Sequence, residues 1–418
     1  MRVQPGEPVA RLTRPVAEAD ADRWRMLGWI CLAELGALSL WFSATAVIPS
    51  LETAWMSAVA TAWVSMAVTL GFVVGTATSA VLTLVDALGA RRLFTVCAVA
   101  GALANAALLV WIDSFAVVVA CRFVTGLAMA GTYPPAMKLA ASWFIRDRGL
   151  AVGSLVGALT FGAAAPHLVN FLGGLAWAVV MLTTSVASVI AAAVMITAVR
   201  DGPHVTARAP FDPRAVGALV TNRGVVLASF GYFGHMWELY AMWSWIGVYL
   251  VEGFTQARVP AAPRAASLAT AVVIAAGGVS CILAGVLADR IGRTATTMLA
   301  MLGSGTCAAV IGFTFGIPWL LTLVALGWGF TIVADSAQFS TSVSELAPRE
   351  YIGTALSLQT CLGFLLTLVS TRLVPTMADA AGWAWAFLFL APGPLVGTLA
   401  MWTLRRLPES RKLALGRR

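Results

Sequence analysis

Charged side chains are scarce in this chain. Only 11% of its 418 residues are Asp, Glu, Lys or Arg, whereas a soluble domain carries about a quarter. Hydrophobic residues make up 60%, and the mean hydropathy is +0.86. These values exclude a soluble globular protein and predict an integral membrane protein whose main surroundings are a lipid bilayer.

Groups that carry catalysis or bind metals are scarce as well. The three histidines are dispersed, and the six cysteines lie inside apolar runs without metal-ligand spacing. There is no Gly-x-x-x-x-Gly-Lys-Ser/Thr loop, so ATP is not the direct energy source. We therefore predict no enzymatic activity, no metal and no cofactor. The net charge of +8 does not indicate nucleic-acid binding, because the arginines cluster in short loops between apolar runs.

Twelve apolar runs of roughly 20 residues follow one another, each long enough to cross a hydrocarbon core of about 30 Å. Their continuous apolarity predicts helices rather than the alternating strands of a barrel. We expect an all-α integral membrane protein with spans near residues 26–50, 59–84, 93–112, 115–141, 149–172, 175–199, 225–251, 265–288, 295–315, 318–343, 353–376 and 381–404.

Polar stretches divide the spans into two sets of six. We predict an N-terminal tail (1–24), a first bundle (25–199), a linker (200–224), a second bundle (225–405) and a C-terminal tail (406–418). The two tails and the loops after even-numbered spans hold 22 of the 27 Lys and Arg residues. By the positive-inside rule, both termini of this multi-pass protein are then cytoplasmic, in the cell (inner) membrane.

A loop motif occurs in both halves, after the second and the eighth span. Residues 285–293 read Gly-Val-Leu-Ala-Asp-Arg-Ile-Gly-Arg, and a weaker copy includes Asp-Ala-Leu-Gly-Ala-Arg-Arg at 86–92. Glycine permits the tight turn, and aspartates and arginines can form ion pairs that hold one conformation and break in another. The predicted conformational gate consists of Asp86, Gly89, Arg91, Arg92, Gly285, Asp289, Arg290, Gly292 and Arg293.

Twelve spans in two sixes, with this loop and with Arg122-Phe-Val-Thr-Gly126 in the fourth span, resemble the major facilitator superfamily of transporters. The resemblance implies two pseudo-symmetric six-helix bundles that rock about a central site. It also implies that spans one, four, seven and ten line a cavity, and that a monomer is sufficient.

The ionisable residues deep in the spans agree with such a cavity, because buried charges in membranes usually face the bundle interior. They occur in spans one, four, five, seven and ten, and the interiors of spans three, six, nine and twelve have none. The residues are Glu34, Arg122, His167, His235, Glu238 and Asp335.

The two glutamates are the best candidates for the proton carrier, and we expect at least one of them to serve in coupling. A shift of 204 residues places Glu34 on Glu238 and Trp41 on Trp245. Removal from water favours the protonated form of a carboxyl group, so such a group can load on one side and unload on the other. His235 lies one helical turn before Glu238 and can relay protons. A purely structural hydrogen bond is the alternative for each of these residues.

Arg122 has two possible roles. It can bind an anionic substrate bidentately, or it can hold a carboxylate such as Glu34 charged until a substrate displaces it. Its counterpart in the second half is Leu326, so the halves share a scaffold and differ in chemistry. The predicted substrate-binding residues are Arg122, Trp41, Trp245, Tyr249, Asp335 and Gln338.

These features predict a secondary active transporter of a small organic solute, coupled to protons and working by alternating access. The single deep arginine favours uptake of an organic anion. The alternative is a proton-antiport exporter of drug-like or cationic compounds, which tryptophans can bind through cation–π contacts. An alternative of another class is a receptor or scaffold that has lost transport.

Overall fold

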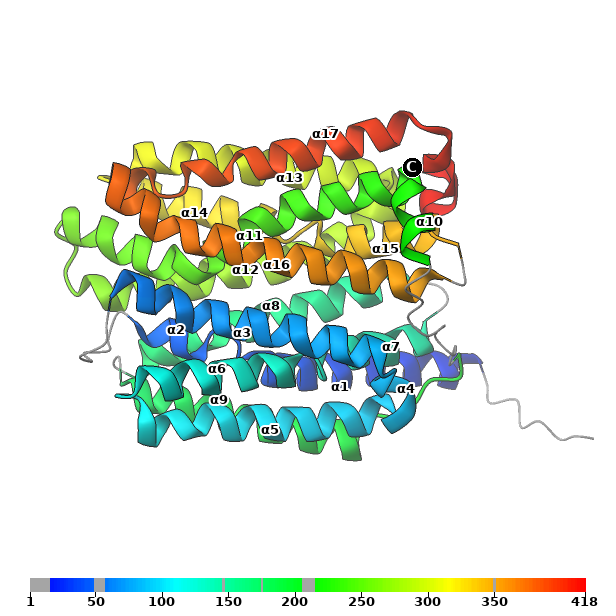
Figure 1. Ribbon diagram of the computed structural model, residues 1–418, viewed down its shortest axis with the longest axis horizontal. Coiled ribbons are helices and arrows are strands. Elements are labelled where there is room, and N and C mark those ends of the chain that lie inside the picture. The colour runs from blue at the N-terminus through cyan, green and yellow to red at the C-terminus, as the bar shows by residue number, and fades with distance from the viewer. Residues whose placement is uncertain (1–15, 49–56, 145–146, 174–175, 205–214, 349–350) are drawn as a thin grey trace, which may run out of the picture.

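The computed structural model describes residues 16–48, 57–144, 147–173, 176–204, 215–348 and 351–418. Within these ranges the chain forms α-helices and short 3₁₀ turns, and no strand. The long helices run roughly side by side along the longest axis of the molecule (Figure 1). The predicted all-α fold is therefore confirmed.

The first half supplies six predicted spans, of which two are interrupted. Span one is divided between two helices, and so is span four. The elements are α1 (Val16–Leu38), α2 (Ser43–Val47), α3 (Ala58–Val81), α4 (Leu84–Leu88), α5 (Ala90–Trp111), α6 (Phe115–Met129), α7 (Tyr133–Trp143), α8 (Arg148–Leu172) and α9 (Trp177–Thr197).

The second half repeats the plan with span ten interrupted and span seven continuous. Its elements are α10 (Ala215–Thr221), α11 (Arg223–Gln256), α12 (Ala262–Ile291), α13 (Arg293–Val310), η2 (Ile311–Thr314), α14 (Pro318–Ile332), α15 (Ser336–Leu346), α16 (Ile352–Ala381), η4 (Trp383–Trp385), η5 (Leu388–Leu390), α17 (Pro392–Arg406) and η6 (Pro408–Gly416).

Some boundaries differ from those expected. Helix α1 begins at Val16, inside the stretch predicted as a polar tail, and α10 lies inside the predicted linker. The described residues contain ten helical segments that are long and apolar enough to cross a membrane. The two predicted spans that do not reach this standard are the first, which is interrupted, and the seventh, which carries His235 and Glu238. Polar residues in these two spans point to an interior role.

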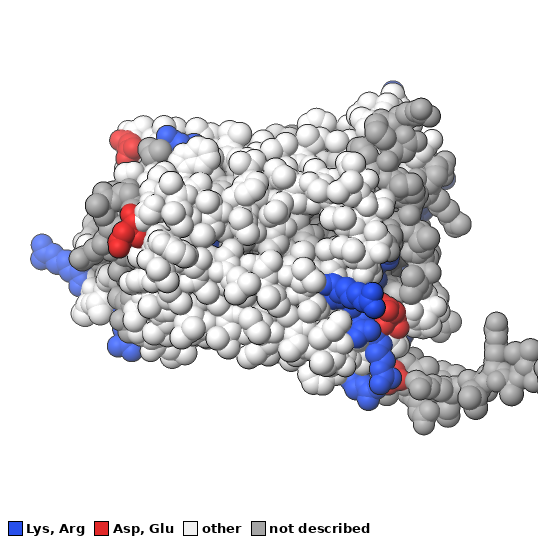
Figure 2. Space-filling model, turned by 60° about the horizontal axis from the view of Figure 1, so that its bottom comes forward, with Lys and Arg blue, Asp and Glu red and all other residues white. Residues whose placement is uncertain are grey.

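The molecular surface agrees with a membrane environment. On the face drawn in Figure 2, uncharged residues form a broad band, and the described Lys, Arg, Asp and Glu residues gather at its two ends. Exposed large hydrophobic side chains on the outer helices include Leu103, Val110 and Trp319. The start of α1 and the end of α17 lie at the same end of the molecule, as an even number of spans requires (Figure 1).

The two halves meet along two pairs of helices. Helix α8 packs along α12, and α3 packs along α16. Glycines allow the first of these contacts to be close, because a Cβ added at Gly153 would lie 2.7 Å from the carbonyl oxygen of Cys281. Between these two seams the halves enclose a cavity.

Candidate functional site

The central cavity lies between the two halves. It comprises about 1050 Å³ of space, including the part open to solvent. Spans one, two, four, five, seven, ten and eleven contribute to its wall. The lining residues are Leu38, Trp41, Phe72, Thr76, Tyr133, Pro134, Met137, Val156, Leu159, Tyr232, Met236, Leu239, Tyr240, Trp243, Val333, Ser336, Ser340, Leu356, Ser357, Thr360 and Phe364.

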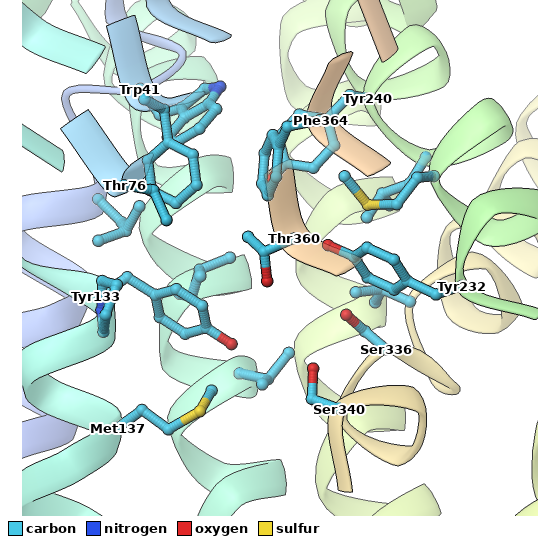
Figure 3. A pocket seen from close by; sticks show the side chains of 18 of the residues that line it. Trp41, Thr76, Tyr133, Met137, Tyr232, Tyr240, Ser336, Ser340, Thr360 and Phe364 are labelled. Atoms are coloured by element: carbon cyan, nitrogen blue, oxygen red, sulfur yellow. The ribbon is translucent and has the colours of Figure 1, made fainter. Parts of the chain in front are cut away.

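An aromatic cluster closes one end of this cavity. The rings of Phe72 and Phe364, from opposite halves, have centroids 4.5 Å apart. Trp41 lies 5.1 Å from Phe72 and 5.3 Å from Tyr240, and Tyr240 lies 4.9 Å from Phe364. Such tilted contacts are favourable between aromatic rings. The cluster therefore joins the halves at one end of the cavity, where Trp41, Tyr240 and Phe364 lie close together (Figure 3).

The structure beyond this cluster is also closed. Asn170 of α8 donates a hydrogen bond from Nδ2 to Oγ of Ser267 in α12, with a distance of 3.1 Å. The same Nδ2 donates to the carbonyl oxygen of Ala46 at 3.0 Å. Both Asn170 and Ser267 are buried. The Asn170–Ser267 hydrogen bond across the seam thus supplements the aromatic contacts on this side.

Hydroxyl groups occupy the other part of the cavity. The side chains of Tyr133 and Tyr232 extend toward each other from opposite walls, and Ser336, Ser340 and Thr360 lie between them and below (Figure 3). The sequence analysis did not single out Tyr133, Tyr232 or Thr360. A usable signal for the tyrosines existed, because the chain has only five, and these two occur in spans four and seven.

Glu34 lies in α1 with its carboxyl group fully enclosed. Neither carboxyl oxygen has a hydrogen-bond partner among the described residues, and the side chain is 0% exposed. Leu38, one helical turn later on the same face, lines the cavity. Tyr133 is within electrostatic reach of Glu34. Glu34 is therefore a buried acid next to the cavity without a donor to stabilise a negative charge.

Arg122 does not contact Glu34. Its guanidinium group donates hydrogen bonds to the carbonyl oxygens of Leu40 and Trp41 and to Oγ of Ser43. These groups lie at the interruption between α1 and α2, where the regular helical hydrogen bonding stops and the Leu40 carbonyl accepts from Ser43 instead. Arg122 is 0% exposed and is not among the residues that line the cavity. In this conformation the arginine caps a helix end inside the bundle.

Glu238 has partners that Glu34 lacks. Its Oε2 accepts a hydrogen bond from Ser304 Oγ at 2.8 Å, and its Oε1 accepts one from Trp328 Nε1 at 2.6 Å. Ser304 belongs to α13 and Trp328 to α14. Glu238 therefore connects three helices inside the second half and does not line the cavity.

His235 and Asp335 form a buried pair. Nδ1 of His235 lies 2.8 Å from Oδ1 of Asp335, and both side chains are at most 2% exposed. Asp335 is located at the interruption between α14 and α15. The pair joins span seven to span ten just behind Tyr232 and Phe339, whose rings lie within 6.2 Å and 5.6 Å of the His235 ring.

Of the predicted substrate-binding residues, the structure places Trp41 in the cavity wall and the others elsewhere. Trp245 Nε1 donates to the carbonyl oxygen of Thr371 at 3.0 Å, and Tyr249 Oη donates to that of Ala384 at 3.1 Å. Both rings pack among other aromatic side chains of the second half. The shift of 204 residues between the two halves identifies equivalent residues, but it does not show which of them reach the cavity.

In the first half, the gate residues fold back on their own bundle. Gly89 has a positive φ of 79°, as the predicted tight turn requires. Arg91 Nη2 donates to the carbonyl oxygen of Ile196 at 2.5 Å, near the end of α9. Arg92 is exposed, and the side chain of Asp86 lies outside the described residues.

The second copy of the loop is more strongly bonded. Gly292 has a φ of 92°. Arg293 donates to both carboxyl oxygens of Glu345, at 2.9 and 2.7 Å, and to Oε1 of Gln338 at 2.9 Å. This bidentate contact ties the start of α13 to α15. Gln338 is thereby engaged by an arginine at the end of the bundle.

Among the described gate residues, Asp289 and Gly285 approach the other half of the molecule. An added Cβ at Gly149, in the first turn of α8, would lie 2.7 Å from Oδ2 of Asp289. A carboxylate at a helix N-terminus is electrostatically favourable. Gly285 supports the same seam, since its own added Cβ would lie 2.7 Å from the carbonyl oxygen of Gly149. Arg290 is exposed.

Comparisons with known proteins agree on the architecture. A sequence profile described as Major Facilitator Superfamily matches residues 30–371. Among solved structures, the nucleoside transporter NupG is similar with a TM-score of 0.70 and 13% identity, covering 91% of this chain and 99% of its own. A D-xylose–proton symporter is similar with a TM-score of 0.69 and 16% identity, covering 95% and 99%. Among curated protein sequences, none matches.

Proposed function

Because the chain belongs to the Major Facilitator Superfamily, we propose that this secondary transporter moves a small organic solute together with, or in exchange for, protons. Membership of a transporter family places the chain among transporters rather than enzymes. The bundles alternate access to the central cavity, in the cell membrane, with both termini in the cytoplasm and a monomer as the working unit.

The observation that carries the proton coupling is the enclosed carboxyl group of Glu34. An ionised carboxylate without a hydrogen-bond donor is costly to bury. In this conformation Glu34 is therefore stable with its proton bound, although access to water in another conformation would let the proton leave. Since Leu38 on the same helix face lines the cavity, the movement that admits solute can also expose this acid.

The other buried ionisable residues support structure in this proposal. Glu238 already has two donors. His235 Nδ1 lies 2.8 Å from Asp335 Oδ1, and Nε2 of His235 has no hydrogen-bond partner among the described residues. We assign Glu238 and the His235–Asp335 pair to the packing of the second half. Arg122 bonds to backbone carbonyls at the interruption of span one. It does not face the cavity, so it no longer supports a preference for an organic anion. Uptake and export remain equally compatible with the geometry.

The test is Glu34→Gln, with Glu238→Gln as the matched control. In proteoliposomes, a solute that stabilises the purified protein is supplied either with a pH gradient or in an exchange assay without one. We expect Glu34→Gln to abolish gradient-driven accumulation and to retain exchange, because the binding cavity is intact while the proton site is lost. Glu238→Gln should retain both. Normal gradient-driven accumulation by Glu34→Gln would contradict the assignment.

A further inference from the structure

The cavity wall has no charged side chain. Among the described residues that line it there is no Asp, Glu, Lys, Arg or His, and also no Asn or Gln. Its polar side chains carry hydroxyls, apart from the indole N–H groups of Trp41 and Trp243, and the remainder is aromatic, aliphatic or thioether. Resting on the proposed function, we propose that the solute is an uncharged heteroaromatic compound of one or two rings that carries hydrogen-bonding groups.

The charged residues nearest the cavity are occupied or enclosed. Arg122 is held by backbone carbonyls, and Asp335 lies against His235. Glu34 is enclosed beneath Leu38 and needs its proton to remain there. An ionised solute in the cavity would therefore lose water without gaining a partner of opposite charge. That loss is costly for an anion and for a cation alike.

The aromatic cluster does not form a cage for a cation. Cation–π recognition needs ring faces that are open to the ligand. Here Trp41 contacts Phe72, Tyr240 and Phe364, at centroid distances between 5.1 and 5.8 Å, so the faces are largely covered by one another. What the cluster presents to the cavity is an apolar boundary against which a flat ring can pack.

The hydroxyl groups supply the specificity. Tyr133, Tyr232, Ser336, Ser340 and Thr360 face the cavity (Figure 3). No hydrogen bond from these hydroxyls to another described residue is present. A hydroxyl both donates and accepts, so this set matches carbonyl, amide, ring-nitrogen and hydroxyl groups of a neutral molecule. Because Tyr133 and Tyr232 belong to different halves, a solute that bonds to both would hold the halves together.

The size of the cavity suits a small molecule. The space open to the centre of a water-sized sphere is about 120 Å³, and one water needs about 10–15 Å³ of such space. The cavity therefore has room for several water molecules. A compound of one or two rings can replace them, with its ring toward the aromatic cluster and its polar groups toward the hydroxyls.

The first experiment compares ligands that share a ring and differ in charge. Thermal stabilisation of the purified full-length protein is measured at neutral pH with nicotinamide, nicotinate and 1-methylnicotinamide, and with uridine and uridine monophosphate. We expect at least one neutral member to stabilise the protein and its charged analogues to bind at least about 10-fold more weakly, because they lose hydration without a counter-charge. Equal or stronger stabilisation by a charged analogue, or none by either neutral compound, would overturn the inference.

The second experiment tests the site with variants. Tyr232→Phe and Thr360→Val each remove one cavity hydroxyl, and each should weaken binding of the neutral ligand by about 3–10-fold. Thr367→Val is the matched control on α16, because Thr367 is buried and its hydroxyl bonds to the carbonyl oxygen of Phe364 instead of facing the cavity. Unchanged affinity in both cavity variants would refute the assigned site.

These assays test the solute class and the proton-coupling role of Glu34 independently. Thermal stabilisation needs no proton gradient, so Glu34→Gln should still bind the neutral ligand. If Glu34→Gln transports normally while the neutral ligand binds, the coupling assignment is wrong and the solute class is right. If only charged analogues bind and Glu34→Gln loses coupling, the reverse holds.

Discussion

The first and seventh spans occupy matching places in the two halves, yet their backbones differ. Span one is interrupted between Leu38 and Ser43, whereas α11 continues without a break through 34 residues. The difference coincides with one side chain in span four. Arg122 caps the carbonyl groups freed by the interruption, and its counterpart Leu326 in the second half has no such groups to cap.

The two equivalent glutamates also differ because of side chains on neighbouring helices. Glu34 and Glu238 are 204 positions apart and both are buried. Only Glu238 meets a hydroxyl and an indole from neighbouring helices. A duplicated scaffold thus provides two equivalent acids, and the surrounding helices determine that one is satisfied and one is not. The comparison teaches that internal symmetry predicts position and that neighbouring helices determine role.

The largest expected loss of stability follows from replacing Arg122 by leucine, the residue found at the equivalent position 326 of the second half. Arg122→Leu should lower the stability of the folded protein by roughly 3–5 kcal/mol, because two buried carbonyl oxygens and the Ser43 hydroxyl lose the guanidinium donors. The measurement is the apparent melting temperature and the yield of monodisperse protein in detergent. Arg122→Lys keeps a cation but loses the planar guanidinium group, so its melting temperature should lie between those of the wild type and Arg122→Leu. A wild-type melting temperature for Arg122→Leu would show that the interruption does not depend on this residue.

A smaller loss of stability is expected when the buried His235–Asp335 pair is broken, a pair without an equivalent in the first half. His235→Leu leaves Asp335 enclosed without its partner, and should cost roughly 2–3 kcal/mol. Replacing both residues by leucine should recover part of that loss, because the unpaired acid is then gone. A double-mutant cycle is obtained by measuring thermal unfolding of His235→Leu, Asp335→Leu and the double variant. Strict additivity would mean that the pair contributes no mutual stabilisation.

The smallest effect sharpens the comparison between the two glutamates. Glu238→Gln should destabilise the protein by about 1 kcal/mol, because an amide cannot accept at both of its polar atoms. Glu34→Gln should change stability by less than about 0.5 kcal/mol, since the Glu34 carboxyl group has no hydrogen-bond partner to lose among the described residues. Parallel melting curves at one pH measure both. Equal losses in the two variants would remove the distinction between a structural and a coupling acid.

Several features of the fold were predictable because the bilayer imposes them. The order of the spans follows from the length of the apolar runs. The two glycine turns follow from the loop motif, and Gly89 and Gly292 do have positive φ. The interruption of span one was not predictable, because Ser39-Leu-Trp-Phe42 contains neither proline nor glycine. The bonds of Arg122, from a helix 80 residues later, compensate for the lost helical hydrogen bonds.

The site was predictable only in part. Trp41 lines the cavity as expected, while Trp245, at the equivalent position, bonds to Thr371 away from it. The hydroxyls of Tyr133, Tyr232 and Thr360 were not expected. A helix has several faces, and the sequence pattern identifies the polar face without showing whether it meets the cavity or another helix.

The sequence by itself determined the membrane environment, the twelve spans, the duplication and the family, because hydropathy, length and a local motif require no knowledge of which helices touch. Only the tertiary structure decided which buried charges are satisfied. A side chain such as Glu238 obtains its partners from helices 66 and 90 residues away. Packing brings those donors to Glu238 and none to Glu34 among the described residues, and that difference is the basis for proposing Glu34 rather than Glu238 as the proton site.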